Sequence, residues 1–167
     1  SDLRLDIQQT ENIPEKTAEV MDTLEKDNQI TKSVALTTKA FSLMKKDKAE
    51  DRLKIKLGNH RVFPVEYTEG KAPTKSNEIA LSSALSDDIE KTLNSTLTIQ
   101  TSQGNKKLKV CGIYSDVTNG GKTAKAAFTD RNAATMWCTI SANVKSDVTP
   151  RQIAKKDSTK FSYAKVS

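Results

Sequence analysis

The sequence predicts an α+β fold: a split βαβ lobe of the ferredoxin-like kind, built from both ends of the chain, that carries an inserted β-rich lobe. Two observations predict this class. Near each end of the chain, segments that alternate apolar and polar residues flank a segment with helical signals. The middle of the chain contains strand and turn signals with a single short helix. We therefore expect one lobe at 1–61 plus 124–167 and the inserted lobe at 62–123.

The first forty residues predict a strand, a helix and a second strand. Apolar residues alternate with charged residues over 3–7, the period of two that a half-buried strand requires. Next, a helix is expected with Pro14 in its first turn, where proline is tolerated, and with Ile13, Val20, Met21 and Leu24 on one apolar face that runs to about Asp27. The β-branched, Thr-rich stretch 30–38 predicts the returning strand.

The C-terminal third repeats this pattern. The strictest alternation in the chain runs over 136–144 and predicts a strand. Thr149-Pro150-Arg151-Gln152 is a capping box with proline at the first helical position, so a short helix should follow to about Lys156. Phe161 and Tyr163 should begin a last strand.

Two β-hairpins and one helix are expected in the middle of the chain. The helix should cover 83–93, with Ser82 or Ser83 as its cap. Each hairpin is indicated by two alternating segments that flank a glycine-containing turn. The predicted pairs are 53–57 with 63–67, across Gly58-Asn59, and 97–101 with 108–114, across 102–105.

The charge of the chain argues against a nucleic-acid partner. The 167 residues carry 27 Lys and Arg against 21 Asp and Glu, a net charge of +6. Lysines supply 22 of these cations and are scattered among acidic residues, whereas nucleic-acid readers rely on Arg with interleaved aromatic residues. No apolar run approaches the ~18 residues of a membrane span, and no signal peptide precedes the first strand. The chain begins with Ser1 rather than methionine, which suggests processing or excision, so the sequence does not exclude a membrane anchor outside these residues.

The segment Asn119-Gly120-Gly121-Lys122-Thr123 ends like a phosphate-binding P-loop. A P-loop requires a glycine five residues before the Gly of Gly-Lys-Thr, and that position is Asp116 here. A carboxylate would repel a phosphate at this point, so we expect an exposed turn between strands. We predict that this loop is a partner-contact or gating element.

No catalytic, cofactor or metal site is predicted. Cys111 and Cys138 are not spaced as metal ligands, and His60 is the only histidine, so a zinc set is absent. Both cysteines fall in predicted strands, where a thiol either fills the core or, in an oxidising compartment, pairs as a disulfide. The acidic clusters at 47–51 and 87–88 lack ligand spacing and indicate solvated faces.

One stretch resembles a known family. The segment 70–82 reads Gly-Lys-Ala-Pro followed by Asn-Glu-Ile-Ala-Leu-Ser, and 108–114 ends in Val-Cys-Gly-Ile-Tyr. These motifs resemble the extracytoplasmic domain of FtsX-like (MacB-type) ABC transporter permeases, and 118–123 is similar to the Gram-positive branch. The resemblance is strongest over 62–128. It departs from the family at Asn94-Ser95, where Gly-Asp is usual.

The resemblance implies a porter-type α/β lobe with an inserted β lobe, without enzymatic activity or cofactor. It implies a place on the extracytoplasmic side of the cell membrane, where the domain couples ATP hydrolysis to export, substrate handling or partner regulation. The implied partners are the transmembrane helices of the same permease, a separate cytoplasmic ATPase subunit, and a second permease copy or accessory extracytoplasmic protein. The two chain ends should then lie together, with Leu5 near Val166. The alternatives are a stand-alone cell-surface binding or adhesion module, and an enzyme.

Overall fold

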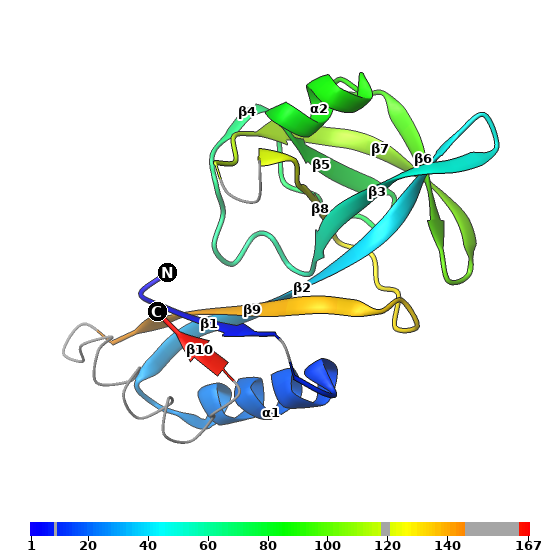
Figure 1. The fold of residues 1–167 in the computed structure, drawn as a ribbon. Helices are drawn as coiled ribbons and strands as arrows, with labels where there is room; N and C mark the ends of the chain where they lie inside the picture. The colour runs from blue at the N-terminus through cyan, green and yellow to red at the C-terminus, as the bar shows by residue number, and fades with distance from the viewer. Residues whose placement is uncertain (9, 118–120, 146–163) are drawn as a thin grey trace. The chain divides into compact units, whose positions relative to one another are not determined.

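A computed structural model describes residues 1–8, 10–117, 121–145 and 164–167. The chain forms two compact units (Figure 1). Unit 1 comprises Ser1–Thr37 and Thr135–Ser167, and unit 2 comprises Thr38–Ala134. These boundaries differ from the expected 61/62 and 123/124. The reason is that two segments of the expected outer lobe, 42–44 and 124–126, pair with strands of the insert at 98–100 and 79–81. The fold is α+β and mostly strand.

In its described residues, unit 1 is a sheet with helix α1 on its face (Figure 1). The helix packs Ile13, Val20 and Leu24 against the sheet, and these side chains join a core cluster with Leu5 and Ile140. The strands lie in the order β10-β1-β9-β2, so β9 separates the two strands that the helix connects. The elements are β1 (Leu3–Ile7), α1 (Ile13–Lys26), the first half of β2 (Ile30–Lys45), β9 (Thr135–Val144) and β10 (Ala164–Val166).

The two chain ends are neighbours in this sheet (Figure 1). Strands β1 and β10 pair antiparallel, with Leu5 opposite Val166. The Arg4 N–H donates to Ser167 O at 2.9 Å, and the Ser167 N–H donates to Arg4 O at 2.8 Å. The expected proximity of the ends is confirmed.

Unit 2 is built around strands whose pairing closes on itself. The order β2-β3-β8-β5-β7 continues through β6, which pairs with both β7 and β2, and β4 adds an edge strand to β7. The alternate side chains of these strands form one core, including Phe41, Ile55, Leu81, Ile99 and Val110. The elements are the second half of β2, β3 (Lys48–Leu57), β4 (Tyr67–Gly70), β5 (Glu78–Ser82), α2 (Ser83–Ile89), β6 (Thr96–Thr101), β7 (Gly104–Tyr114) and β8 (Ala124–Ala126).

The second predicted hairpin and the middle helix are confirmed. Strands β6 and β7 pair antiparallel, and Thr101 opposite Gly104 leaves a two-residue turn. Ser82 caps α2, since its Oγ accepts from the Leu85 N–H at 3.2 Å. The helix ends at Ile89, four residues earlier than expected, because Glu90 takes the left-handed conformation that ends helices.

The predicted pairing of 53–57 with 63–67 is wrong. Strand β3 neighbours β2 instead, across a turn at Lys46 and Asp47, and pairs in parallel with β8. Both turn residues have positive φ, at 47° and 66°, the geometry of a type I′ hairpin. Asn and Gly normally mark such a turn, so the Lys-Asp pair gave no signal.

The expected helix at 150–156 and the strand start at 161–163 lie outside the described residues. Strand β9 is confirmed and extends the predicted segment by Thr135. No helix in the described ranges is long and apolar enough to cross a membrane.

Candidate functional site

The predicted contact loop connects β7 to β8 in unit 2. Asn119 and Gly120 lie outside the described residues. Of the described part, Gly121 is buried, and Lys122 is exposed. Val117 is 96% exposed, the most exposed large hydrophobic side chain that the structure describes. The sequence analysis did not predict the exposure of Val117, because nothing in the sequence distinguishes a single exposed valine among polar residues from a buried one.

Thr123, at the end of this loop, is hydrogen-bonded to Tyr114 and Asp116 at its start. Its hydroxyl donates to Asp116 Oδ2 at 2.5 Å and lies 2.8 Å from the Tyr114 hydroxyl. Because the Thr123 proton goes to the carboxylate, Tyr114 is the donor to Thr123 Oγ1. Burial raises the pKa of Tyr114 well above its ordinary value, which keeps this donor protonated. Asp116, the residue that argued against a P-loop, is therefore the acceptor that closes the loop.

The same threonine joins the loop to the helix cap. The Thr123 N–H donates to Ser82 Oγ at 3.1 Å, and the Ser82 N–H donates to Thr123 O at 2.9 Å. Ser82 is fully buried, so its hydroxyl serves both α2 and the loop. The stem of the contact loop is thus held by β5, β7 and α2 together.

Replacing Thr123 by valine is expected to loosen this stem. The change keeps the shape of the side chain but leaves Tyr114 and Asp116 without their shared partner, which costs about 1–3 kcal/mol. Amide hydrogen exchange should become faster at Ser82 and Lys122. The control is Thr96→Val on the exposed start of β6, which should leave those rates unchanged. Equal exchange in both variants would contradict the role of Thr123.

A shallow depression of about 300 Å³ lies beside the loop, between β3 and α2. Its lining combines the apolar Leu53, Leu85 and Ile89 with charged side chains that include Asp88 and Lys122. Lys122 Nζ lies 3.2 Å from Asp88 Oδ1, and both side chains are about half exposed (55% and 47%). An exposed pair of this kind contributes at most about 1 kcal/mol and exchanges partners easily.

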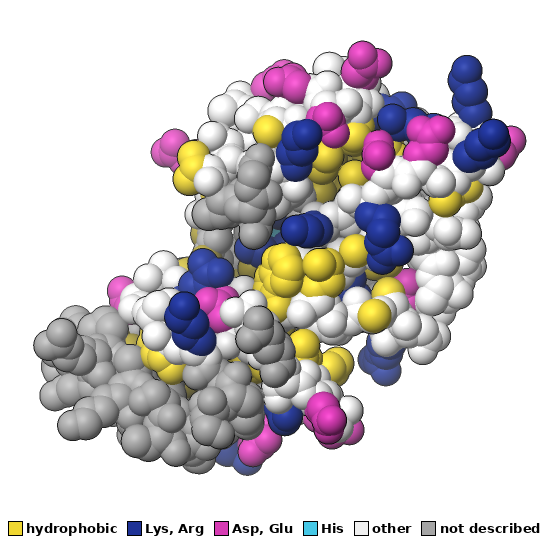
Figure 2. Space-filling model, viewed as in Figure 1, with side chains coloured by type: hydrophobic (Ala, Val, Ile, Leu, Met, Phe, Trp, Pro, Cys, Tyr) yellow, Lys and Arg dark blue, Asp and Glu magenta, His cyan; other side chains and the backbone are white. Residues whose placement is uncertain are grey.

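The net charge of the chain belongs to unit 2. Unit 2 carries 17 Lys and Arg against 11 Asp and Glu, a net +6, whereas unit 1 carries 10 of each. On the face in Figure 2, basic and acidic side chains are interspersed over unit 2. Next to the loop, Lys125 lies opposite Lys56 in the β3–β8 register, with its Nζ 4.6 Å from the Tyr114 ring centre. Burial, together with the charge of Lys56, lowers the pKa of Lys125 to about 8.

The candidate disulfide is not formed in this structure. Cys111 and Cys138 are free and buried, one in the core of unit 2 and the other in the core of unit 1. Cys111 Sγ donates to Lys71 O at 3.4 Å, and burial raises the pKa of Cys111 to about 11. Both thiols therefore act as small core side chains, the first of the two readings that the sequence allowed.

His60 is a structural residue. It is buried, and its Nε2 lies 2.9 Å from Lys56 O and 3.0 Å from Ala126 O. Burial, and then the charge of Lys125, lowers the pKa of His60 to about 4, so the ring is neutral and its Nε2–H donates to both carbonyls. Among the described residues, no group of three His, Cys, Asp or Glu side chains could hold a metal ion.

The two segments that carry the family resemblance, 70–82 and 108–114, pack against each other, because β4 and β5 both pair with β7. Gly70 has φ +66°, and a Cβ there or at Gly112 would overlap the main chain opposite. The turn between β4 and β5 is closed by Glu78, whose carboxylate accepts from the N–H groups of Thr74 and Lys75 at 3.0 and 2.9 Å. The motif is therefore explained by close backbone packing rather than by chemistry.

Three solved structures have this fold over nearly the whole chain. The periplasmic region of MacB from Actinobacillus actinomycetemcomitans matches with a TM-score of 0.67 and 11% identity, over 100% of this chain and 88% of that one. The extracellular domain of the noncanonic ABC-type transporter YknZ from Gram-positive bacteria matches with 0.59 and 13%, over 99% and 98%. A domain of a putative permease protein from Porphyromonas gingivalis matches with 0.57 and 10%, over 96% and 84%.

No protein-family profile and no curated protein matches this chain. At 10–13% identity the likeness concerns the fold. The resemblance read from segments 70–82 and 108–114 is confirmed at that level. The chain has the fold of the extracytoplasmic domain of MacB-type ABC transporter permeases.

Proposed function

We propose that this chain is the non-catalytic extracytoplasmic domain of an ABC transporter permease. The observation that carries the proposal is the likeness to three transporter domains, each over at least 84% of its own length. The domain couples ATP hydrolysis by a separate cytoplasmic ATPase subunit to export, substrate handling or partner regulation outside the membrane. It works at the cell membrane, on the extracytoplasmic side.

The paired chain ends support a mechanical role. Two membrane helices that continue from β1 and β10 would meet unit 1 at neighbouring strands, so a movement of either helix would act on the same sheet. Unit 2 contains neither end and receives movement through the chain crossings, one of which is the 16-residue strand β2. The order β10-β1-β9-β2 also supports the finer proposal that unit 1 is a porter-type split βαβ lobe.

The loop between β7 and β8 is the proposed contact or gating element, and Asn119 to Thr123 belong to it. Its fastened stem and the exposed Val117 support this role, because a fixed stem can present an apolar side chain without losing its position. Its partner is a second permease copy or an accessory extracytoplasmic protein. No catalytic role is assigned, since the His60 ring is committed to two carbonyls and both thiols are buried.

Labelling of a new cysteine tests the location. In the full-length protein in intact cells, Val117→Cys should react to near completion with a membrane-impermeant maleimide. The matched control is the parent protein, whose buried Cys111 and Cys138 should stay unlabelled. Reaction after cell lysis alone would contradict the extracytoplasmic location. Labelling in a chain without a ~20-residue apolar helix on each side would instead favour the adhesion module.

A further inference from the structure

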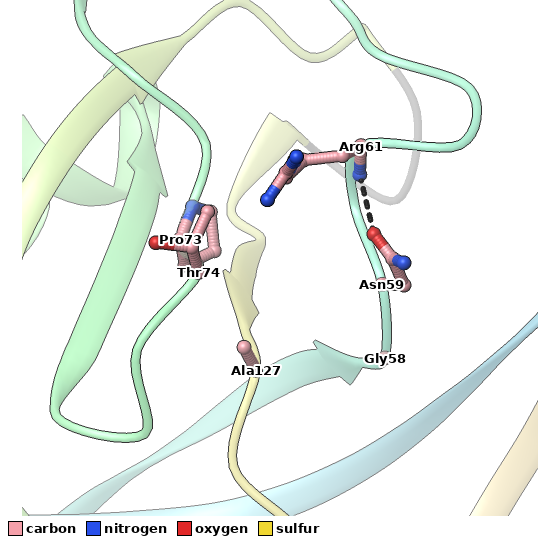
Figure 3. A pocket seen from close by; sticks show the side chains of 6 residues that line it. All are labelled: Gly58, Asn59, Arg61, Pro73, Thr74 and Ala127. Atoms are coloured by element: carbon pink, nitrogen blue, oxygen red, sulfur yellow. Dashed lines mark hydrogen bonds between the residues drawn. The ribbon is translucent and has the colours of Figure 1, made fainter.

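A second hollow lies in unit 2, at the start of the long connection between β3 and β4. Its volume is about 280 Å³, close to the lower end of the range for small-ligand sites. Two chain segments form its walls, the turn at 58–61 and the turn at 73–74, and β8 leads into it at Ala127 (Figure 3). The lining residues are Gly58, Asn59, Arg61, Pro73, Thr74 and Ala127.

The walls of this hollow are fixed by hydrogen bonds. The first turn is bound to β8 because the Gly58 N–H donates to Ala126 O at 3.2 Å. His60, between them, donates to the carbonyls of Lys56 and Ala126 and so bridges β3 and β8. The second turn is held by Glu78, which accepts from Thr74. A ligand would therefore meet a preformed site and lose little free energy to ordering it.

Among the described side chains that line the hollow, Arg61 alone is charged. Its backbone N–H donates to Asn59 Oδ1 at 3.0 Å, which fixes the start of the side chain. In Figure 3 the guanidinium extends away from Asn59, into the space toward Pro73 and Thr74. Within the described ranges the guanidinium has no carboxylate partner. Its planar fork is suited to a carboxylate, with which it forms two parallel hydrogen bonds.

We propose that this hollow binds a carboxylate on a small, apolar body, such as the last residue of a peptide chain. One guanidinium neutralises one negative charge, which fits a carboxylate better than a phosphate dianion. Beside the cation, Pro73 and Ala127 supply apolar contacts and Gly58, which lacks a Cβ, leaves room, while Asn59 and Thr74 make the rest of the lining polar. The proposal does not depend on the permease assignment.

A titration with a defined peptide tests the proposal. The probe is N-acetyl-Ala-Ala-Ala with a free C-terminal carboxylate, added to the ¹⁵N-labelled 167-residue chain. We expect saturable chemical-shift changes at Gly58, Thr74 and Ala127 with a Kd of about 1 mM. The C-terminal amide of the same peptide should produce none of them. Arg61→Gln should weaken binding at least about tenfold, and Arg61→Lys, which keeps the charge without the fork, should lie between.

The matched control is Arg131→Gln, which removes the same charge from an exposed position of unit 2. It should leave the peptide affinity unchanged, and every variant should keep the dispersed amide spectrum of the parent. Equal weakening by both Gln variants would overturn the proposal, because binding would then follow net charge. Tighter binding of inorganic phosphate than of the peptide at the same amides, or no saturable shift with the peptide, would overturn it as well.

Discussion

Replacing Gly112 by alanine is expected to destabilise unit 2 by about 3 kcal/mol, because the new Cβ has no room. A Cβ at this position would overlap the Lys71 carbonyl oxygen and lie 2.9 Å from Tyr67 Cδ1. The carbonyl is main chain between β4 and β5, so it cannot turn aside as a flexible side chain would. The measurement is urea unfolding followed by circular dichroism, compared with the parent chain.

Gly104→Ala is the matched control for this substitution. Gly104 has φ +107°, but no atom lies within 4 Å of a Cβ built there. Alanine at this position therefore costs backbone strain alone, about 1–2 kcal/mol. The contrast separates crowding from strain. A Gly112→Ala chain that unfolds within 1 kcal/mol of the control would mean that β4 can move away from β7 at little cost.

Acidification is expected to remove about 3 kcal/mol of stability through His60 alone. The folded pKa of about 4 is below the ordinary value of 6.5, so the unfolded chain binds more protons between these two pH values. Stability from this group is therefore complete above pH 6.5 and is lost as the pH falls toward 4. Protonation would place a charge beside Lys125 in a buried position. NMR titration of the imidazole carbon-bound protons should give a midpoint near pH 4.

His60→Gln separates this effect from the protonation of carboxylates. The glutamine amide can still donate to a carbonyl of β3 or β8 but does not titrate. The free energy of unfolding of the variant should therefore fall less steeply with acid than that of the parent. The quantity to compare is the difference in urea midpoints between pH 7 and pH 4.5 for the two chains. Parallel losses in parent and variant, or an imidazole midpoint near 6.5, would contradict a buried neutral His60.

The sequence was informative where the structural signal is local. The alternation over 136–144 and the helix with Pro14 in its first turn appear as β9 and α1, because burial of one face imposes its period on the residues themselves. The β6–β7 hairpin followed from the same rule together with a glycine in its turn. The motifs at 70–82 and 108–114 could also be recognised in the sequence. Their glycines, Gly70 and Gly112, are required because two chain segments lie in close contact there.

The sequence predicted the position of the candidate site but not its side-chain contacts. The loop at 119–123 could be identified by its glycines and its place after a strand, and Asp116 removed the P-loop interpretation. The exposure of Val117 and the hydrogen bonds from Tyr114 to Thr123 and from Thr123 to Asp116 could not be foreseen. These features depend on which side chains meet after β5, β7 and β8 have paired.

By itself, the sequence determined the α+β class, the positions of most strands and both helices among the described elements, and the family that the chain resembles. The tertiary structure decided which strands are partners. It placed β3 between β2 and β8, moved the unit boundary to Thr38 and Ala134, and left Cys111 and Cys138 as free core thiols. The reason is physical: strand periodicity is set by the solvent on each side of one segment, whereas pairing is set by the burial of whole faces contributed by residues far apart in the chain.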